Sequence, residues 1–131
     1  MLRTLPAAVA VVVALLFAAP ADAGRYLVEA TGGPGPGSPA DAVQLLEGVI
    51  IPTFDIIEKW EKDGTAVAGL PTGGRSFVMI VDVESNHALD VMLRSLPAWP
   101  ILEWSVTPVE MIGDRSATER KMVAELKKGM K

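Results

Sequence analysis

The sequence predicts an α+β domain whose elements follow the order β-α-β-β-α-β, with one further helix at the C-terminus. Three observations predict this order. Apolar residues recur at helical spacing in two separate segments, residues 41–62 and 86–96. Short runs rich in β-branched and aromatic residues precede, separate and follow these segments. Glycine and proline clusters mark the boundaries.

The first 23 of the 131 residues have the pattern of a secretory signal peptide. Arg3 is followed by an apolar run over residues 7–19 and then by Ala21-Asp22-Ala23, an A-x-A cleavage pattern. The run is shorter than the ~20 residues that a membrane span needs. We expect cleavage after Ala23, a secreted or periplasmic protein and no stable membrane span. The alternative is a retained N-terminal anchor.

The composition narrows the classes of function. Residues 24–131 keep the net charge of −4, because the first segment removes one base and one acid. No basic stripe with interleaved aromatic residues is present, so we expect no nucleic-acid partner. The chain has no cysteine and one histidine, which argues against disulfides and a structural zinc site. We therefore expect no metal or cofactor, and stability that comes from packing and oligomerisation.

The first predicted strand covers residues 24–30 and leads into the segment TGGPGPGSPAD, residues 31–41. A glycine-rich loop after a strand suggests a phosphate-binding loop. The spacing fits neither known pattern, and the prolines remove backbone N–H groups that a phosphate would need. We interpret this segment as a flexible surface loop.

Two helices are expected within residues 41–62. The apolar positions fall on one face, and Pro52 interrupts them. A proline fits the first turn of a second helix or kinks a continuous one. We expect a short helix to about Gly48 and a main helix from about Pro52 to Asp63, ended by Gly64.

The middle of the chain predicts a hairpin. Residues 65–71 indicate a weak strand, residues 72–74 a turn, and residues 75–83 (RSFVMIVDV) the strongest strand in the chain. Ser85 then caps a helix whose apolar stripe ends at Leu96, and Pro97 stops that helix.

The last predicted strand covers residues 101–111 and begins directly after Pro100. Residues 116–119 (SATE) have the form of a capping box and predict the start of a charged C-terminal helix. Its apolar stripe is narrow and consists of Met122, Leu126 and Met130.

This order is that of the ferredoxin-like fold, a four-stranded antiparallel sheet with two helices on one face. The second face of the sheet must then be buried by another surface, and in a small chain we expect a second subunit to bury it. We expect a signal peptide over residues 1–23, the domain over residues 24–112 and the charged C-terminal helix over residues 113–131.

The segment LPAWPILEWSVTPV (residues 96–109), preceded by EKDGTAVAG (61–69) and VDVESNHALDVML (81–93), resembles the muconolactone delta-isomerase family. The resemblance covers residues 51–111 and is most specific at the L-P-x-aromatic-P turn. It implies a dimeric α/β barrel and proton transfer on a small lactone or unsaturated acid. Family members carry basic, histidine and tryptophan residues on the second and third strands, where this chain keeps only Arg75.

Two carboxylates are the first candidates for a catalytic base. Isomerising an unsaturated lactone moves a proton between carbons, which a carboxylate or histidine in a dry pocket can do. Glu103 shares a face of the last strand with Ser105, and Glu29 lies on the adjoining first strand. The alternative is an ion pair of Glu103 with Arg75 or a lysine at the surface or at a subunit interface.

Further site candidates come from single residues. His87 is the third predicted catalytic residue, since the pKa of histidine suits proton transfer, although a first helical turn is often exposed. Arg75 is predicted to bind a substrate carboxylate, or else it is a surface charge at a strand end. Trp60 and Trp104 are predicted to line the substrate site; core or interface burial is the alternative for them and for Trp99.

The sequence thus leaves three functions open. The first is an exported, cofactor-independent isomerase that shifts a C=C bond, with Glu103 as the base and Arg75 binding the carboxylate. The second is a non-catalytic module that binds a small apolar ligand, and the third is an oligomerisation unit without a pocket. All three imply a homodimer or a larger homo-oligomer.

Overall fold

The computed structural model describes residues 24–130, and the predicted signal peptide lies outside them. The expected order of elements is confirmed. The elements are β1 (Gly24–Gly32), α2 (Pro39–Leu45), the π-helical segment η1 (Leu46–Ile50), α3 (Ile51–Lys62), β2 (Ala66–Gly69), β3 (Ser76–Val83), α4 (Asn86–Arg94), the 3-10 turn η2 (Trp99–Ile101), β4 (Leu102–Val109) and α5 (Ile112–Lys128).

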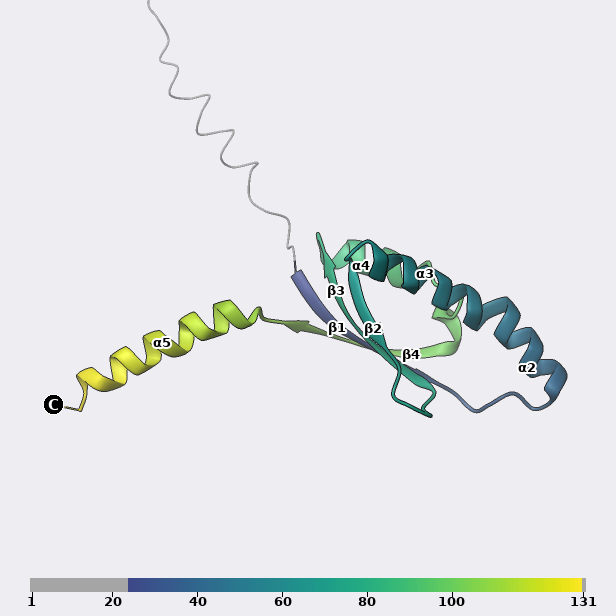
Figure 1. The fold of residues 1–131 in the computed structure, drawn as a ribbon, viewed down its shortest axis with the longest axis horizontal. Helices are drawn as coiled ribbons and strands as arrows, with labels where there is room; N and C mark the ends of the chain where they lie inside the picture. Colours follow the sequence, from purple (N-terminus) through teal and green to yellow (C-terminus); the bar gives the residue numbers. More distant parts are fainter. Residues whose placement is uncertain (1–23, 131) are drawn as a thin grey trace, which may run out of the picture.

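The four strands form one antiparallel sheet in the order β2-β3-β1-β4, which is the ferredoxin-like topology that the sequence predicts. β1 is central, with Ala30 opposite Phe77 of β3 on one side and Trp104 of β4 on the other. This register places alternate residues of the neighbouring strands on a common face. Figure 1 shows the helices α3 and α4 covering one face of the sheet.

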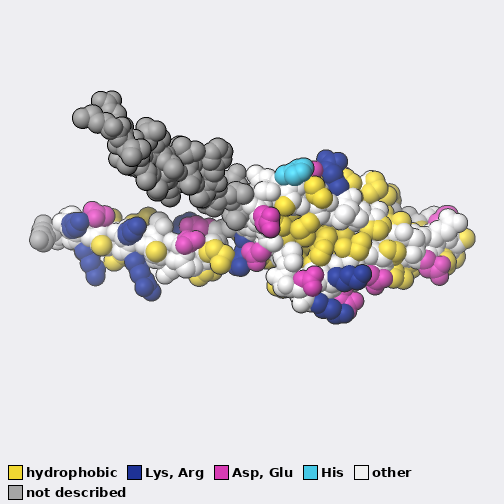
Figure 2. Space-filling model, turned by 90° about the horizontal axis from the view of Figure 1, so that it is seen from above, with side chains coloured by type: hydrophobic (Ala, Val, Ile, Leu, Met, Phe, Trp, Pro, Cys, Tyr) yellow, Lys and Arg dark blue, Asp and Glu magenta, His cyan; other side chains and the backbone are white. Residues whose placement is uncertain are grey.

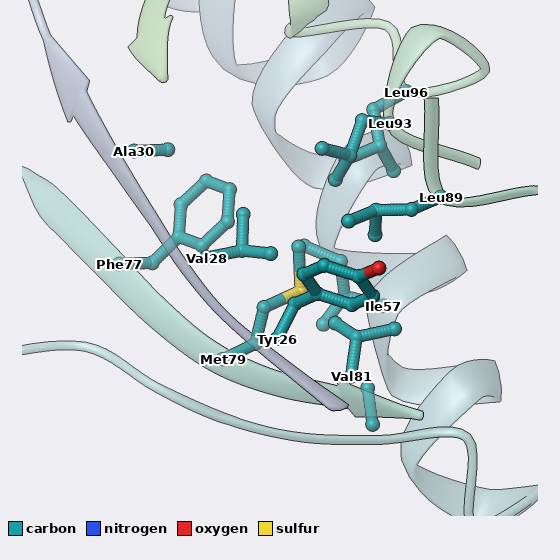
Figure 3. Packing of buried hydrophobic residues seen from close by; sticks show 11 residues of the cluster. Tyr26, Val28, Ala30, Ile57, Phe77, Met79, Val81, Leu89, Leu93 and Leu96 are labelled. Carbon is teal, nitrogen blue, oxygen red and sulfur yellow. The ribbon is translucent and has the colours of Figure 1, made fainter. Parts of the chain in front are cut away.

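The core lies between that face and the helices. β1 and β3 contribute alternate residues, and α3 and α4 contribute their apolar stripes, as Figure 3 shows. Its buried members are Tyr26, Val28, Ala30, Ile57, Ala66, Phe77, Met79, Val81, Leu89, Leu93 and Leu96. The predicted stripe of the second helix is therefore the one that packs on the sheet.

The other face of the sheet carries no helix (Figure 1). It presents apolar side chains, among them Val67, which is 73% exposed, and Val78, which is 38% exposed. Ile80 of β3 pairs with Val67 on one side and with Leu27 of β1 on the other, and both Ile80 and Leu27 are half-buried. The prediction that a second subunit covers this face stays a prediction, because the structure is of one chain.

Residues 39–62 are continuously helical, so the predicted break between two helices is wrong. The chain passes Pro52 through η1, where the N–H of Ile51 bonds to the carbonyl of Leu46, five residues earlier. The ring of Pro52 would crowd the carbonyl of Gly48 in a regular α-helix, and the wider turn directly before it relieves this contact. The first helix therefore begins at Pro39, capped by Ser38, and runs on into α3.

The cap and the turn around α4 agree with the sequence. The Ser85 hydroxyl accepts a hydrogen bond from the N–H of Ala88, and the helix ends at Arg94, before Pro97. Trp99 then stacks on Trp104, with ring centroids 5.0 Å apart, and its carbonyl accepts a bond from the Trp104 indole. The two prolines of the turn thus fix a corner that the tryptophan pair closes.

The C-terminal helix does not begin at the predicted capping box. It begins at Ile112, and Ser116 lies inside it. Glu119 bonds to Arg115 at 2.6 Å, so its carboxylate is engaged along the helix, where a capping box would need it to turn back toward a backbone N–H. Figure 1 shows α5 projecting away from the sheet and the other helices.

No helix within residues 24–130 is long and apolar enough to cross a membrane.

Candidate functional site

A partly open cavity of about 410 Å³ lies between the first helical segment, the glycine-proline loop and one end of the sheet. Its lining is almost wholly apolar. It consists of Gly32, Gly33, Pro34, Gly35, Pro36, Ala42, Leu45, Leu46, Ile50, Thr53, Phe54, Leu70, Gly74, Arg75, Phe77, Ala98, Ile101 and Leu102. Ligand pockets of proteins have about 300–1,000 Å³, so the cavity has the size of a small-molecule site.

The helical wall of the cavity depends on the π-helical segment. η1 contributes Leu46 and Ile50, while α2 before it contributes Leu45. π-turns inside α-helices occur often at functional sites, because they turn side chains out of the regular helical phase. The Val49 carbonyl of this segment accepts a bond from the hydroxyl of Thr53, four residues later.

Thr53 joins this wall to the proline-rich turn. Its side chain is 1% exposed, and its hydroxyl donates to the carbonyl of Val49 at 2.8 Å and accepts the N–H of Ala98 at 3.0 Å. Both of these bonds are made inside the protein, so the hydroxyl is already satisfied. Thr53 is therefore a structural tie beside the cavity.

Arg75 is the only ionisable residue that lines the cavity. Its backbone carbonyl accepts a bond from the N–H of Gly32 at 3.3 Å, which joins the loop to the start of β3. A Cβ at Gly35 would lie 2.9 Å from the Arg75 Cζ, so the guanidinium rests directly against the loop backbone at that glycine. The cavity therefore combines apolar walls with one planar cation.

The two predicted carboxylates lie on one face, as expected, but on the face that carries no helix. Glu103 pairs with Thr31 and Glu29 pairs with Ser105, which makes the two carboxylates diagonal neighbours on adjacent strands. Both are exposed, and neither lines the cavity. Within one chain, the sheet separates them from Arg75's pocket, and the catalytic roles predicted for them stay predictions.

The other predicted site residues are dispersed. His87 lies in the first turn of α4 and is exposed. Trp60 and Trp104 are half-buried and pack against the core. Trp104 also meets Phe77 edge to face, with ring centroids 5.7 Å apart. Of the predicted residues, only Arg75 reaches the cavity.

Sequence reasoning missed most of the cavity wall. The glycine-proline loop was interpreted as a surface loop, and its close approach to Arg75 has no signature in residue spacing. Leu46 and Val43 were expected on one helical face, but Leu46 lines the cavity together with Leu45, and Val43 does not. The one available signal was Pro52, because a proline within an apolar helical pattern indicates an irregular turn.

A smaller groove adjoins this cavity between α3 and β2, and it shares Phe54, Leu70 and Phe77 with the cavity. Its lining consists of Phe54, Ile57, Glu58, Glu61, Ala68, Gly69, Leu70 and Phe77. Another hollow lies at the far end of β1, where Arg25 pairs with Asp82 at 2.7 Å. The hydrogen bond and the charge of Asp82 raise the pKa of Arg25.

Within residues 24–130, no three or more acidic, histidine or cysteine side chains come together in a way that could hold a metal ion.

Fold and cavity together define a ferredoxin-like domain with an apolar pocket under its helices. Among solved structures, the chain is similar to muconolactone isomerase, with a TM-score of 0.55 and 24% sequence identity. The similarity covers 66% of this chain and 88% of that chain. The chain therefore has a muconolactone-isomerase-like fold, as the resemblance of residues 51–111 implied. No family model matches the chain, and no curated protein matches its sequence.

Proposed function

We propose that the protein binds a small apolar molecule with a carboxylate group, and that the cavity beside Arg75 is its binding site. One observation carries this proposal: the cavity has apolar walls and a single ionisable residue, Arg75. A planar guanidinium matches a carboxylate through two parallel hydrogen bonds. The apolar walls would bury the rest of the ligand, which is the usual division of roles in a ligand pocket.

The cavity favours binding over catalysis. None of the residues that line it is a carboxylate or a histidine. Proton transfer between carbons needs such a base within hydrogen-bond reach of the substrate. A ligand held here would meet apolar side chains, backbone groups and the guanidinium, and these bind and orient it.

Binding is tested by titration calorimetry with 2-naphthoate and with its neutral methyl ester. We expect the wild-type protein to prefer the carboxylate. Replacing Arg75 with Gln should weaken carboxylate binding at least tenfold, because a hydrogen bond to a charged group contributes about 1.5–3 kcal/mol. Binding of the ester should change little.

Two further variants sharpen this test. Arg75→Lys keeps the charge but loses the planar fork, so it should recover only part of the affinity. Arg25→Gln removes an arginine at the opposite end of the sheet and serves as the matched control. Equal losses for the carboxylate and the ester in Arg75→Gln, or an equal loss in Arg25→Gln, would refute the proposed role of the guanidinium.

A second candidate is the isomerase activity itself, which the similarity to muconolactone isomerase favours together with the neighbouring positions of Glu29 and Glu103. In this alternative a second subunit covers the helix-free face and closes a site around the two carboxylates. Glu103 would be the base, and muconolactone or a related unsaturated acid the substrate.

The isomerase candidate is tested by proton–deuterium exchange on muconolactone. Glu103→Gln should abolish exchange, and Glu110→Gln, which removes a carboxylate just beyond β4, should not. Exchange that is absent in the wild-type protein, or that survives in Glu103→Gln, would reject this role. The Arg75 titrations do not depend on that outcome.

Export and assembly complete the proposal. The sequence pattern of residues 1–23 supports secretion, and mass spectrometry of the N-terminus in the producing cell tests cleavage after Ala23.

The exposed Val67 and Val78 support a homodimer through the helix-free face. Val78→Lys should lower the association constant, measured by sedimentation, whereas Val91→Lys on the helical side should not.

A further inference from the structure

Within residues 24–130, no other helix or strand makes an extended contact with the helix α5. None of its residues is buried, and none belongs to the core. Its apolar side chains are open to solvent: Met122 is 51% exposed and Leu126 is 62% exposed. In proteins most of the stability of a helix comes from packing of its apolar face against another surface.

Apolar residues gather on one side of the C-terminal half of α5. Met122 and Leu126 lie there four residues apart with Val123 beside them, and Met130 follows two residues beyond the end of the helix. Figure 2 shows Lys and Arg side chains spread along this helix with apolar side chains between them. α5 is therefore an amphipathic helix with basic flanks.

Charge separates this helix from the rest of the protein. Residues 24–111 contain twelve acidic and five basic residues, a net charge of −7. Residues 112–131 contain three acidic and six basic residues, a net charge of +3. Two copies of α5 would repel each other, whereas the acidic body of a second copy attracts the helix.

The groove between α3 and β2 has the complementary chemistry. Apolar side chains form its floor, among them Phe54, Leu70 and Phe77. Its only charged lining residues are Glu58 and Glu61 of α3, and Glu58 already forms a surface ion pair with Lys62. An apolar helix face with lysines and arginines beside it fits this groove.

The helix cannot easily reach the groove of its own chain. α5 follows β4, and β4 and β2 are the two outer strands of the sheet. Three strand spacings separate them by about 14 Å. Met122 lies ten residues into α5, about 15 Å further from β4, and Figure 1 shows the helix pointing away from the sheet.

We propose that α5 of one copy docks through Met122 and Leu126, together with Met130 just after the helix, into the α3–β2 groove of a second copy of this chain. Arg120 and Lys127 then lie beside the rim carboxylates of that second copy. Two copies that exchange helices in this way form a closed pair. The groove adjoins the ligand cavity, with which it shares Phe54, Leu70 and Phe77, and it lies on the helical side of the sheet, away from the helix-free face.

Single cysteines test the contact directly, because the chain has none of its own. Glu61→Cys and Lys127→Cys proteins are mixed in equal amounts, oxidised with oxidised glutathione and analysed by non-reducing electrophoresis and peptide mass spectrometry. We expect the mixed disulfide in at least tenfold excess over that from Asp55→Cys with Lys127→Cys. Asp55 is the matched control, since it is an exposed acid of α3 outside the groove.

A second measurement does not need cysteines. Leu126→Asp, introduced alone into the wild-type protein, should lower the association constant at least tenfold in sedimentation experiments. Ala117→Asp should not, because Ala117 lies nine residues before Leu126, two and a half turns away, on the opposite side of the helix.

Three results would overturn the proposal. The first is a mixed disulfide no more abundant than the Asp55 control. The second is a dominant disulfide between two Lys127→Cys chains, which would show helix-to-helix pairing. The third is a combination of two observations: the wild-type protein floats with phosphatidylglycerol vesicles and Leu126→Asp does not, while the mixed disulfide stays at the control level. This result would assign α5 to an anionic membrane surface.

Discussion

The hydroxyl of Thr53 predicts a defined loss of stability when it is replaced by a methyl group. Thr53→Val keeps the shape and the β-branching of the side chain but removes the acceptor for the N–H of Ala98. Ala98 is fully buried, so its N–H finds no water in place of the hydroxyl. An unsatisfied buried donor costs about 1–3 kcal/mol, so we expect about 2 kcal/mol of destabilisation. This is roughly a thirtyfold change in the unfolding constant.

Thr53→Ser is the matched comparison. It keeps both hydrogen bonds and loses one methyl group, which should cost about 1 kcal/mol. Urea unfolding gives both free energies, and the m-values should stay unchanged. Hydrogen exchange adds a local measurement, because the amide of Ala98 should lose protection in Thr53→Val and keep it in Thr53→Ser. If Thr53→Val were as stable as Thr53→Ser, the bond to Ala98 would contribute nothing and the reasoning would be refuted.

Three other substitutions test the packing, the helix cap and the loop. Leu93→Ala should lower the free energy of unfolding in urea by about 3 kcal/mol, because Leu93 is buried in the core. Val91→Ala on the exposed side of α4 should change it by less than about 0.5 kcal/mol. Equal losses in the two variants would contradict the packing of α4. Ser85→Ala should cost about 1 kcal/mol through the lost N-cap, and no loss would show that the bond to Ala88 is not needed. Gly35→Ala should change the free energy of unfolding by under about 0.5 kcal/mol but weaken 2-naphthoate binding, because its Cβ displaces the guanidinium of Arg75. Gly33→Ala has free space around it and should bind as the wild type does. Equal binding by all three proteins would show that the loop does not position Arg75 for the ligand.

Local patterns were sufficient for most of the fold. The run RSFVMIVDV predicted β3, and the Ser85 cap with the stripe to Leu96 predicted α4, because these signals lie within a few residues of the elements they specify. The topology followed from the order of elements, since few arrangements satisfy a β-α-β-β-α-β chain. The Pro97–Pro100 turn carried the family resemblance for the same local reason.

The errors arose where the outcome depends on distant or competing contacts. Pro52 is compatible with a break or with a widened turn, and the chain adopts the widened turn. At the C-terminus, the Glu119 carboxylate could accept a capping hydrogen bond or form an ion pair with Arg115, and it forms the ion pair. The local sequence favoured the break and the capping box, and both of these predictions are wrong.

The candidate site was less predictable than the fold. Alternation along β4 placed Glu103 and Glu29 correctly on a common face, but it did not say which face the helices cover. Arg75 was identified from its residue type beside a turn. Its neighbours in the cavity come from five separate segments, and only folding brings these together.

The π-turn at residues 46–50 makes the specificity of the cavity sensitive to chain length. Such a turn holds one residue more than the regular helix needs. Deleting Gly48 would therefore leave α3 in place and rotate α2 by about 100° around its axis. Ala42 and Leu45 would leave the wall and other side chains of α2 would enter it. Deletion of this single residue would thus change which ligands the cavity prefers, while the core, which contains no residue of α2 or η1, would keep its contacts.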